Sequence, residues 1–340
     1  MRAAVVGAGV IGLSVAHELR AAGVDVVVFA DAPDPRDCSP LAGAVWFPYG
    51  VSLDPAVVAM SDRTRVRLEA LASDPATGVA RRRGTYVVRR DGVDLSWAND
   101  LPERADVAAA DLPAGALGAF RAVLPVVDMS RYLPWLRRRV TAMGVELRTH
   151  RVTDLDELDG AGGASGFGEA GAGGGLGASA VDPGFDAIVV AAGIRSTELV
   201  VDDEPMRPRR GQVVRLANPG LTDWIIDEDA PDGMTYVIPR FDDVVCGGTS
   251  IDDWSTELDP ATAEAILRRA RAIEPALLGA SVVSEGVGLR PSRRVPRVER
   301  LERRGVPTFA CYGHGGAGVS LSWGSAESIV RLLEAAGVPE

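Results

Sequence analysis

Short apolar runs alternate with an amphipathic stretch over the first thirty residues. Residues 2–6 (RAAVV) and 25–29 (DVVVF) predict two buried strands, and residues 13–22 predict a helix that ends before Gly23. A strand, a helix and a second strand in this order predict a βαβ unit with parallel strands and a right-handed crossover. A further apolar strand at residues 187–192 lies far along the chain, so we expect a sheet assembled from separated segments.

The middle of the chain has a different pattern. β-rich runs at residues 84–88 and between 212 and 248 are separated by Asp, Pro and Gly, which predicts an antiparallel sheet. At residues 129–143 and 260–274 the sequence predicts helices, the second from apolar side chains that recur every three or four positions. The fold class is therefore α/β, with a Rossmann-like dinucleotide-binding domain and a second α+β domain built on an antiparallel sheet. The first is expected from residues 1–45, 128–210 and 284–340, and the second from residues 46–127 and 211–283.

Residues 160–184 are almost entirely Gly and Ala. Such a segment buries too little apolar area to offset the entropy of ordering it, so we expect a flexible surface loop. Long surface loops add little closure entropy, which favours a tolerated insertion over a functional hinge.

Composition narrows the class of protein. The 340 residues carry 36 basic and 47 acidic side chains, and a net charge of −11 argues against a nucleic-acid partner. Three cysteines, Cys38, Cys246 and Cys311, cannot all pair, which favours free thiols in a reducing cytoplasm. No run approaches the roughly 20 apolar residues that cross a bilayer, and we expect no bound metal.

The turn after the first strand carries a nucleotide-binding motif, GAGVIG. Gly7 permits a tight turn, Gly9 permits close approach of a pyrophosphate, and Gly12 permits close helix packing. Asp31 follows the second strand, 19 residues after Gly12, where a ribose-binding carboxylate is expected. The motif predicts an adenine dinucleotide and does not separate FAD from NAD.

Several further motifs cover nearly the whole chain. They are LAGAVWFPY at residues 41–49, PRRGQ at 208–212, TYVIP at 235–239, VGLRP at 287–291 and CYGHGGAGVSLSWG at 311–324. Together with GAGVIGLS at residues 7–14 they resemble the D-amino acid oxidase family. The resemblance implies FAD as cofactor, a D-amino acid and molecular oxygen as substrates, and hydride transfer from the substrate Cα to the flavin N5. The products would be a 2-oxo acid, ammonia and hydrogen peroxide.

The resemblance also implies which residues form the site. Arg290 would bind the substrate carboxylate as a bidentate guanidinium, the Tyr236 hydroxyl would reinforce that contact, and the Gly316 carbonyl would accept from the substrate amine. His314 would hold structure or cofactor in place, so no side chain acts as acid or base. The residues expected to bind the cofactor are Gly7, Gly9, Val10, Ile11, Gly12, Asp31, Ala42, Gly43, Ala44, Val152, Gly193, Gly315, Gly316, Gly318, Val319 and Ser320.

The side-chain pocket is expected to be apolar and aromatic, which favours neutral substrates. Its candidates are Phe47, Tyr49, Ile226, Met234 and Ile238. The acidic run at residues 227–229 would repel a dicarboxylate and attract D-Arg or D-Lys, although a charge run is often only a solvated face. The segment before Tyr236 lacks the additional tyrosine that vertebrate members carry four residues earlier, which puts a lid mechanism in doubt.

Alternatives stay open at this point. D-Aspartate oxidases share VGLRP and GGT, but they carry a basic residue after GGT where this chain has Ser250. A glycine or sarcosine oxidase, an NAD-dependent dehydrogenase and a non-catalytic FAD-binding protein share the amino-terminal motif. The sequence leaves the oligomeric state open, a homodimer included.

Overall fold

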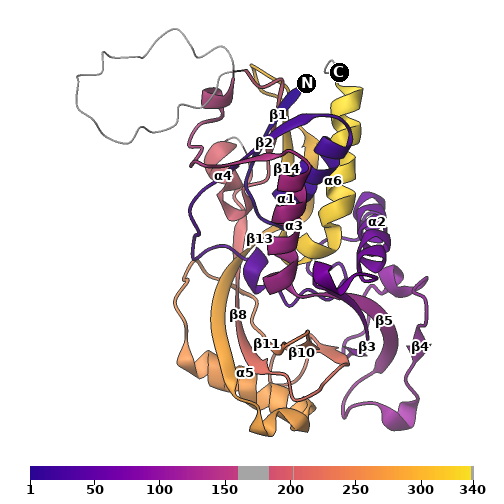
Figure 1. Cartoon of the computed structure of the whole chain (residues 1–340). Coiled ribbons are helices and arrows are strands. Elements are labelled where there is room, and N and C mark those ends of the chain that lie inside the picture. The colour runs from indigo at the N-terminus through magenta and orange to yellow at the C-terminus, as the bar shows by residue number, and fades with distance from the viewer. Residues whose placement is uncertain (160–183, 202, 338–340) are drawn as a thin grey trace.

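The strands of the protein form one continuous sheet. A computed structural model describes residues 1–159, 184–201 and 203–337, so the predicted surface loop lies outside the described residues apart from Gly184. The strand order is β4-β5-β3-β9-β10-β11-β8-β13-β14-β7-β1-β2-β6, and β12 pairs with β8. In Figure 1 the parallel half with the first helix lies at the top, and the antiparallel half lies at the bottom.

The parallel half confirms the predicted βαβ unit. Its strands are β1 (Arg2–Val6), β2 (Asp25–Ala30), β6 (Glu146–Thr149), β7 (Ala187–Val190) and β14 (Thr308–His314). These strands pair in parallel in the order β14-β7-β1-β2-β6. Helix α1 (Val10–Ala21) connects β1 to β2 and begins three residues earlier than predicted, because its first turn follows Gly9 directly.

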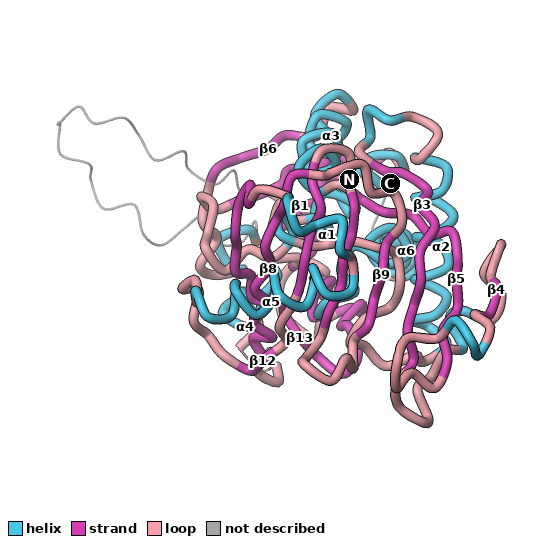
Figure 2. The backbone as a smooth tube through the Cα atoms, turned by 90° about the horizontal axis from the view of Figure 1, so that it is seen from below, coloured by secondary structure: helices cyan, strands magenta, loops and turns pink. Residues whose placement is uncertain are grey.

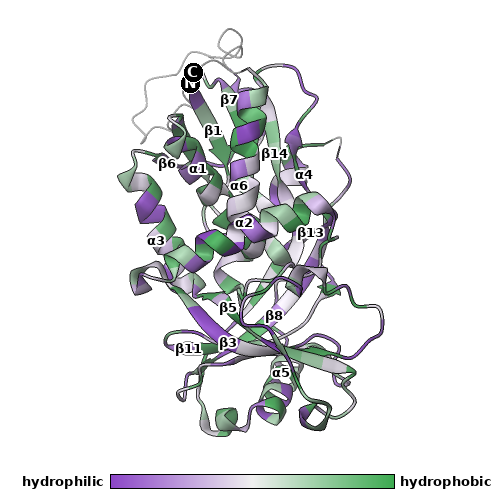
Figure 3. Ribbon diagram, turned by 90° about the vertical axis from the view of Figure 1, so that its right-hand side faces the viewer, coloured by the Kyte–Doolittle hydropathy of each residue, from purple (hydrophilic) through white to green (hydrophobic). Residues whose placement is uncertain are grey.

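Alternation along β1 divides the core between the two faces of the parallel half. Ala3 and Val5 pack into the same apolar cluster as residues of α1, α3 (Met129–Ala142) and α6 (Gly318–Ala335). Ala4 and Val6 face the opposite side, in the cluster that includes Leu199 of α4 (Ser196–Leu199). Figure 3 shows the apolar strand β1 beside α1 and α6. Helices on both faces explain why these strands read as continuous apolar runs.

The antiparallel half confirms the predicted β-rich middle of the chain. Its strands are β3 (Val79–Val88), β4 (Ala105–Asp106), β5 (Gly118–Val127), β8 (Arg207–Ala217), β9 (Trp224–Asp227), β10 (Thr235–Pro239), β11 (Asp243–Gly247), β12 (Ile251–Asp252) and β13 (Val282–Arg300). Neighbouring strands run antiparallel except β3 and β9, which pair in parallel. Helix α5 (Pro260–Ile273) covers one face, where Val214, Val237 and Cys246 are buried beneath Ile266. The other face is left to line a pocket.

Strand β13 joins the two halves. It pairs with β8 along residues 282–292 and with β14 along residues 292–300, so the parallel and antiparallel regions share one sheet instead of forming two. The expected domain boundaries after residues 210 and 283 fall inside β8 and β13. The division into two domains stays a prediction.

Helix α2 (Pro55–Leu71) was missed by the sequence analysis. Its buried positions include Ser61 and Thr64 besides apolar residues, which weakens the apolar periodicity. It packs against α6, and the two helices lie side by side in Figure 2. A Cβ at Gly324 would overlap the Met60 backbone, so this contact requires glycine. No helix among the described residues is both long and apolar enough to cross a membrane.

Candidate active site

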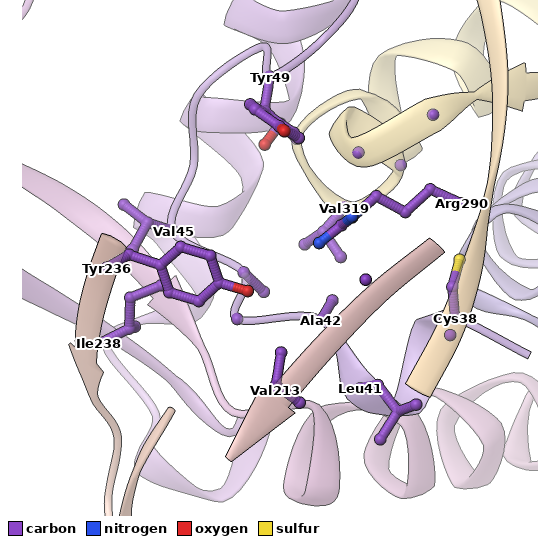
Figure 4. A pocket seen from close by; sticks show the side chains of 18 of the residues that line it. Cys38, Leu41, Ala42, Val45, Tyr49, Val213, Tyr236, Ile238, Arg290 and Val319 are labelled. Atoms are coloured by element: carbon purple, nitrogen blue, oxygen red, sulfur yellow. The ribbon is translucent and has the colours of Figure 1, made fainter. Parts of the chain in front are cut away.

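A pocket lies where the two halves of the sheet meet. It encloses about 960 Å³ including its open mouth. Its walls come from the segment 38–49, from strands β8, β9, β10 and β13, and from residues 315–320 at the start of α6. Figure 4 shows the guanidinium of Arg290 and the hydroxyl of Tyr236 directed into this space.

Strand alternation decides which side chains reach the pocket. Successive residues of a strand point to opposite faces, so residues two apart share a face. Tyr236 and Ile238 of β10 line the pocket, whereas Val237 between them is buried against α5. On β13 the pair is Gly288 and Arg290, which follows the same spacing.

Arg290 is held by backbone carbonyls instead of by a carboxylate. Its Nη1 donates to the Thr249 carbonyl at 2.9 Å, and its guanidinium lies 5.9 Å from the ring centroid of Tyr49. The side chain is only partly buried, and among the described residues no carboxylate lies within 4 Å of it. A cation in such a pocket, with donors to spare, is suited to bind an anionic ligand.

Tyr236 lies against two glycines. A Cβ at Gly247 or Gly248 would overlap its phenol ring, so the GGT segment makes room for this side chain. Burial raises the pKa of Tyr236, and the positive charge of Arg290 opposes that shift. The hydroxyl therefore stays protonated and can donate to an anion beside Arg290.

Gly211 is a site residue that sequence reasoning missed, although it lies within the PRRGQ motif. It is paired with Gly288 in the β8–β13 register, and a Cβ there would overlap the guanidinium of Arg290. Glycine at this position thus permits the arginine to cross the sheet surface. The pocket residues that were not expected are Cys38, Ser39, Leu41, Val45, Gly211, Val213, Glu228 and Gly288.

The carboxyl ends of the parallel strands can accept an adenine dinucleotide. Gly7 has φ of +115°, and a Cβ there would overlap the Ala191 carbonyl, so only glycine fits this turn. The amino terminus of α1 follows at Gly9. The Val10 N–H donates to the Ser39 Oγ at 3.3 Å, and the next backbone N–H groups of the first turn can face a pyrophosphate. Val152 follows β6, and Gly193, with φ of +58°, follows β7 at the same edge.

Asp31, the expected ribose-binding carboxylate, pairs with arginines of the protein. Its Oδ2 accepts from Arg195 Nη1 at 3.0 Å and lies 3.5 Å from Arg151, while its Oδ1 accepts from the Ala32 N–H. Each carboxylate oxygen has a second lone pair, so a ribose hydroxyl can still donate to it. Its role toward the cofactor stays a prediction.

The start of α6 fits the flavin end of such a cofactor. The helix has no side-chain cap, and its first residues line the pocket. The Ser320 Oγ accepts from the Phe47 N–H at 3.1 Å, which leaves its own O–H free to donate. A Cβ at Gly316 would overlap the Tyr49 ring. Facing this helix, Ala44 has φ of +54°, a left-handed conformation that alanine adopts only under constraint from its surroundings.

His314 lies outside the pocket lining. It is buried and its Nε2 lies 3.0 Å from the Ser325 Oγ within the protein. Burial lowers its pKa from 6.5 to about 4, so the imidazole is neutral near pH 7. These properties suit a structural role, as expected from the sequence.

The structure brings most of the expected residues together. All eight expected substrate-binding residues line the pocket. So do Val10, Ala42, Gly43, Ala44, Gly315, Gly316, Gly318, Val319 and Ser320 from the expected cofactor set. The others, Gly7, Gly9, Ile11, Gly12, Asp31, Val152 and Gly193, lie outside it, at or near the edge of the parallel strands.

Comparison with known proteins defines the class. Residues 2–332 match the model of the FAD dependent oxidoreductase family (DAO), and the chain belongs to this family. The residues at both helix termini thus fit the cofactor that the family uses. The chain is 41% identical to a D-amino-acid oxidase of Rubrobacter xylanophilus, over 98% of this chain and 96% of the relative.

The chain is also similar to a second curated relative and to a solved structure, both at lower sequence identity. A human D-aspartate oxidase is 31% identical, over 98% of this chain and 94% of the relative. The crystal structure of an iminodiacetate oxidase from Chelativorans sp. BNC1 has a TM-score of 0.79, at 19% identity, and covers 98% of this chain and 95% of that one. The last similarity concerns the fold alone.

Proposed function

We propose that this protein is a D-amino acid oxidase that converts D-amino acids, water and oxygen to 2-oxo acids, ammonia and hydrogen peroxide. The observation that carries the proposal is Arg290, a cation in the pocket that lies beside the start of α6 and has no carboxylate partner among the described residues. The identity to the Rubrobacter xylanophilus enzyme over almost the full length supports the same activity.

The pocket residues orient the substrate. Arg290 binds the α-carboxylate with its free guanidinium donors, and the protonated Tyr236 adds a second donor. The backbone carbonyl of Gly316, which lines the same pocket, accepts from the substrate amine. FAD, which the residues at the starts of α1 and α6 would hold, would supply the hydride-accepting and oxygen-reducing chemistry at this site. The protein contributes orientation of the substrate.

The pocket lining argues against a dicarboxylate substrate. Phe47, Ile226 and Met234 present apolar surface, and the second charged side chain in the pocket, Glu228, is acidic. Ser250 adds no positive charge where D-aspartate oxidases were expected to carry one. Neutral or basic D-amino acids are therefore favoured over D-aspartate.

Peroxide release from the purified, yellow protein tests the proposal. The substrates are D-alanine, D-methionine, D-lysine, D-aspartate, glycine and sarcosine, with L-enantiomers as controls. Peroxide with neutral or basic D-amino acids supports the proposal. The best rate with glycine or sarcosine would contradict it, and FAD binding without peroxide from any substrate would indicate a non-catalytic protein.

Replacing Arg290 by Ala tests the carboxylate contact. We expect KM to rise by about 100-fold or more, because two charge-assisted hydrogen bonds are lost, with FAD content unchanged. Arg300→Ala is the matched control, since Arg300 is exposed on the same strand and does not line the pocket. An unchanged KM for the Arg290 variant removes this residue from substrate binding.

A further inference from the structure

Three consecutive acidic residues, Asp227 to Asp229, begin at the last residue of β9, and they differ sharply in surroundings. Asp227 is buried and pairs with Arg89 at 2.8 Å. Asp229 pairs with Arg90 at 2.6 Å. Both charges are thus neutralised by arginines that follow β3. The run is therefore not a solvated acidic face.

Glu228 is the member of the run that lines the pocket. Its Oε2 accepts from the Tyr86 hydroxyl at 2.6 Å. Among the described residues no arginine lies within 4 Å of its carboxyl group. Burial raises the pKa of Glu228; Tyr86 and Arg90 oppose the shift, and Asp229 adds to it. An acid kept in a pocket without a cationic partner is suited to receive one from a ligand.

Glu228 and Arg290 approach the pocket from separate strands. Strand β9, which ends just before Glu228, is four strands from β13 in the sheet. Four steps of about 4.8 Å place β9 and β13 roughly 19 Å apart, measured along the sheet. Both side chains line the same pocket, so a ligand that contacts both must reach from one to the other. The pocket is also lined by Phe47, Ile226 and Met234, whose apolar side chains are suited to methylene groups.

We propose that Glu228 is a specificity-determining residue that binds the distal cation of a basic D-amino acid, such as D-lysine or D-arginine. This assignment rests on the proposed oxidase function. Arg290 takes the carboxylate end of the substrate, the apolar wall takes its methylene stem, and Glu228 takes the ammonium or guanidinium group. Tyr86 orients the carboxyl group through Oε2, which leaves Oε1 for the ligand.

The test compares two substrates of the same length with the holoenzyme. D-Lysine carries the distal charge, and D-norleucine replaces it with a methyl group. Glu228→Gln keeps the shape and the hydrogen bond to Tyr86 but removes the charge. We expect the variant to lose about 10- to 100-fold in kcat/KM for D-lysine, whereas kcat/KM for D-norleucine stays the same or rises.

Asp229→Asn is the matched control. It removes the same charge at the next residue, whose side chain does not line the pocket. Its ratio of kcat/KM for the two substrates should equal that of the wild type. Glu228→Asp keeps the charge and should retain part of the preference for D-lysine over D-norleucine. This variant provides a second measurement if Glu228→Gln folds poorly.

The outcomes separate the two proposals. Suppose that the wild type oxidises D-norleucine, and that kcat/KM for D-lysine divided by kcat/KM for D-norleucine is the same in Glu228→Gln as in the wild type. Glu228 then does not select the substrate, and the inference is overturned. An equal change in Asp229→Asn points to general surface charge and overturns it as well. If the wild type releases no peroxide with any D-amino acid, the proposed function itself fails.

Discussion

Gly211 and Arg290 share one space on the sheet surface: a Cβ at position 211 would overlap the guanidinium that lies there. The two residues come from β8 and β13, whose pairing brings Gly211 opposite Gly288, two residues before the arginine. The position of the Arg290 guanidinium thus depends on the absence of a side chain on the neighbouring strand.

Gly211→Ala should displace Arg290 and raise KM for the preferred D-amino acid by about 10- to 100-fold, because a shift of about 1 Å is enough to impair catalysis. FAD content should not change. Gly118→Ala serves as the control, since a Cβ at that strand position meets no atom within 4 Å. Wild-type KM in the Gly211 variant, measured by peroxide release, would show that the arginine does not need this space.

Gly324→Ala should destabilise the protein by about 1 to 3 kcal/mol, because its Cβ would overlap the Met60 backbone where α2 crosses α6. Alanine is otherwise the better helix former, so a gain in stability would show that the helices can separate at no cost. Thermal unfolding measures the effect. Gly279→Ala, with open space around its Cβ, should unfold near the wild-type temperature.

His314 should make the protein acid-sensitive. Its pKa is about 4 in the folded state against 6.5 as the usual value, so the unfolded chain binds the proton first. The stability contributed by the neutral imidazole is complete above pH 6.5 and is lost as the pH falls from 6.5 to 4, by about 3 kcal/mol. Below pH 4 both states are protonated, and this contribution stops changing.

Unfolding temperatures across this pH range test the assignment. His314→Gln should show a shallower loss between pH 6.5 and 4 than the wild type. His150→Gln is the control, because His150 lies partly exposed beside Glu157. Equal slopes in all three proteins would assign the acid sensitivity to other groups.

Local sequence patterns predicted a large part of the site. Gly7 adopts a turn that only glycine fits, a Cβ at Gly12 would overlap the Gly7 carbonyl, and the strand–helix–strand pattern places this turn at a sheet edge. The resemblance of VGLRP and TYVIP to a known family identified Arg290 and Tyr236. Both side chains lie in the pocket, as expected.

Other features arise from pairing between distant segments. Helix α2 was missed because hydroxyl side chains interrupt its apolar pattern, and they are buried only once α6 packs against them. The continuous sheet was missed because the sequence analysis predicted no strand over residues 282–300, and nothing local shows that β13 pairs with β8 at one end and with β14 at the other.

The sequence by itself determined the βαβ unit and the glycine turn after β1, because each depends on residues close together in the chain, and its resemblance to a known family pointed to Arg290. Only the tertiary structure decided that Glu228 faces the pocket while Asp227 and Asp229 pair with arginines that follow β3. The sequence shows which residues carry charge, but whether an acidic side chain has an arginine partner depends on the pairing of β9 with β3.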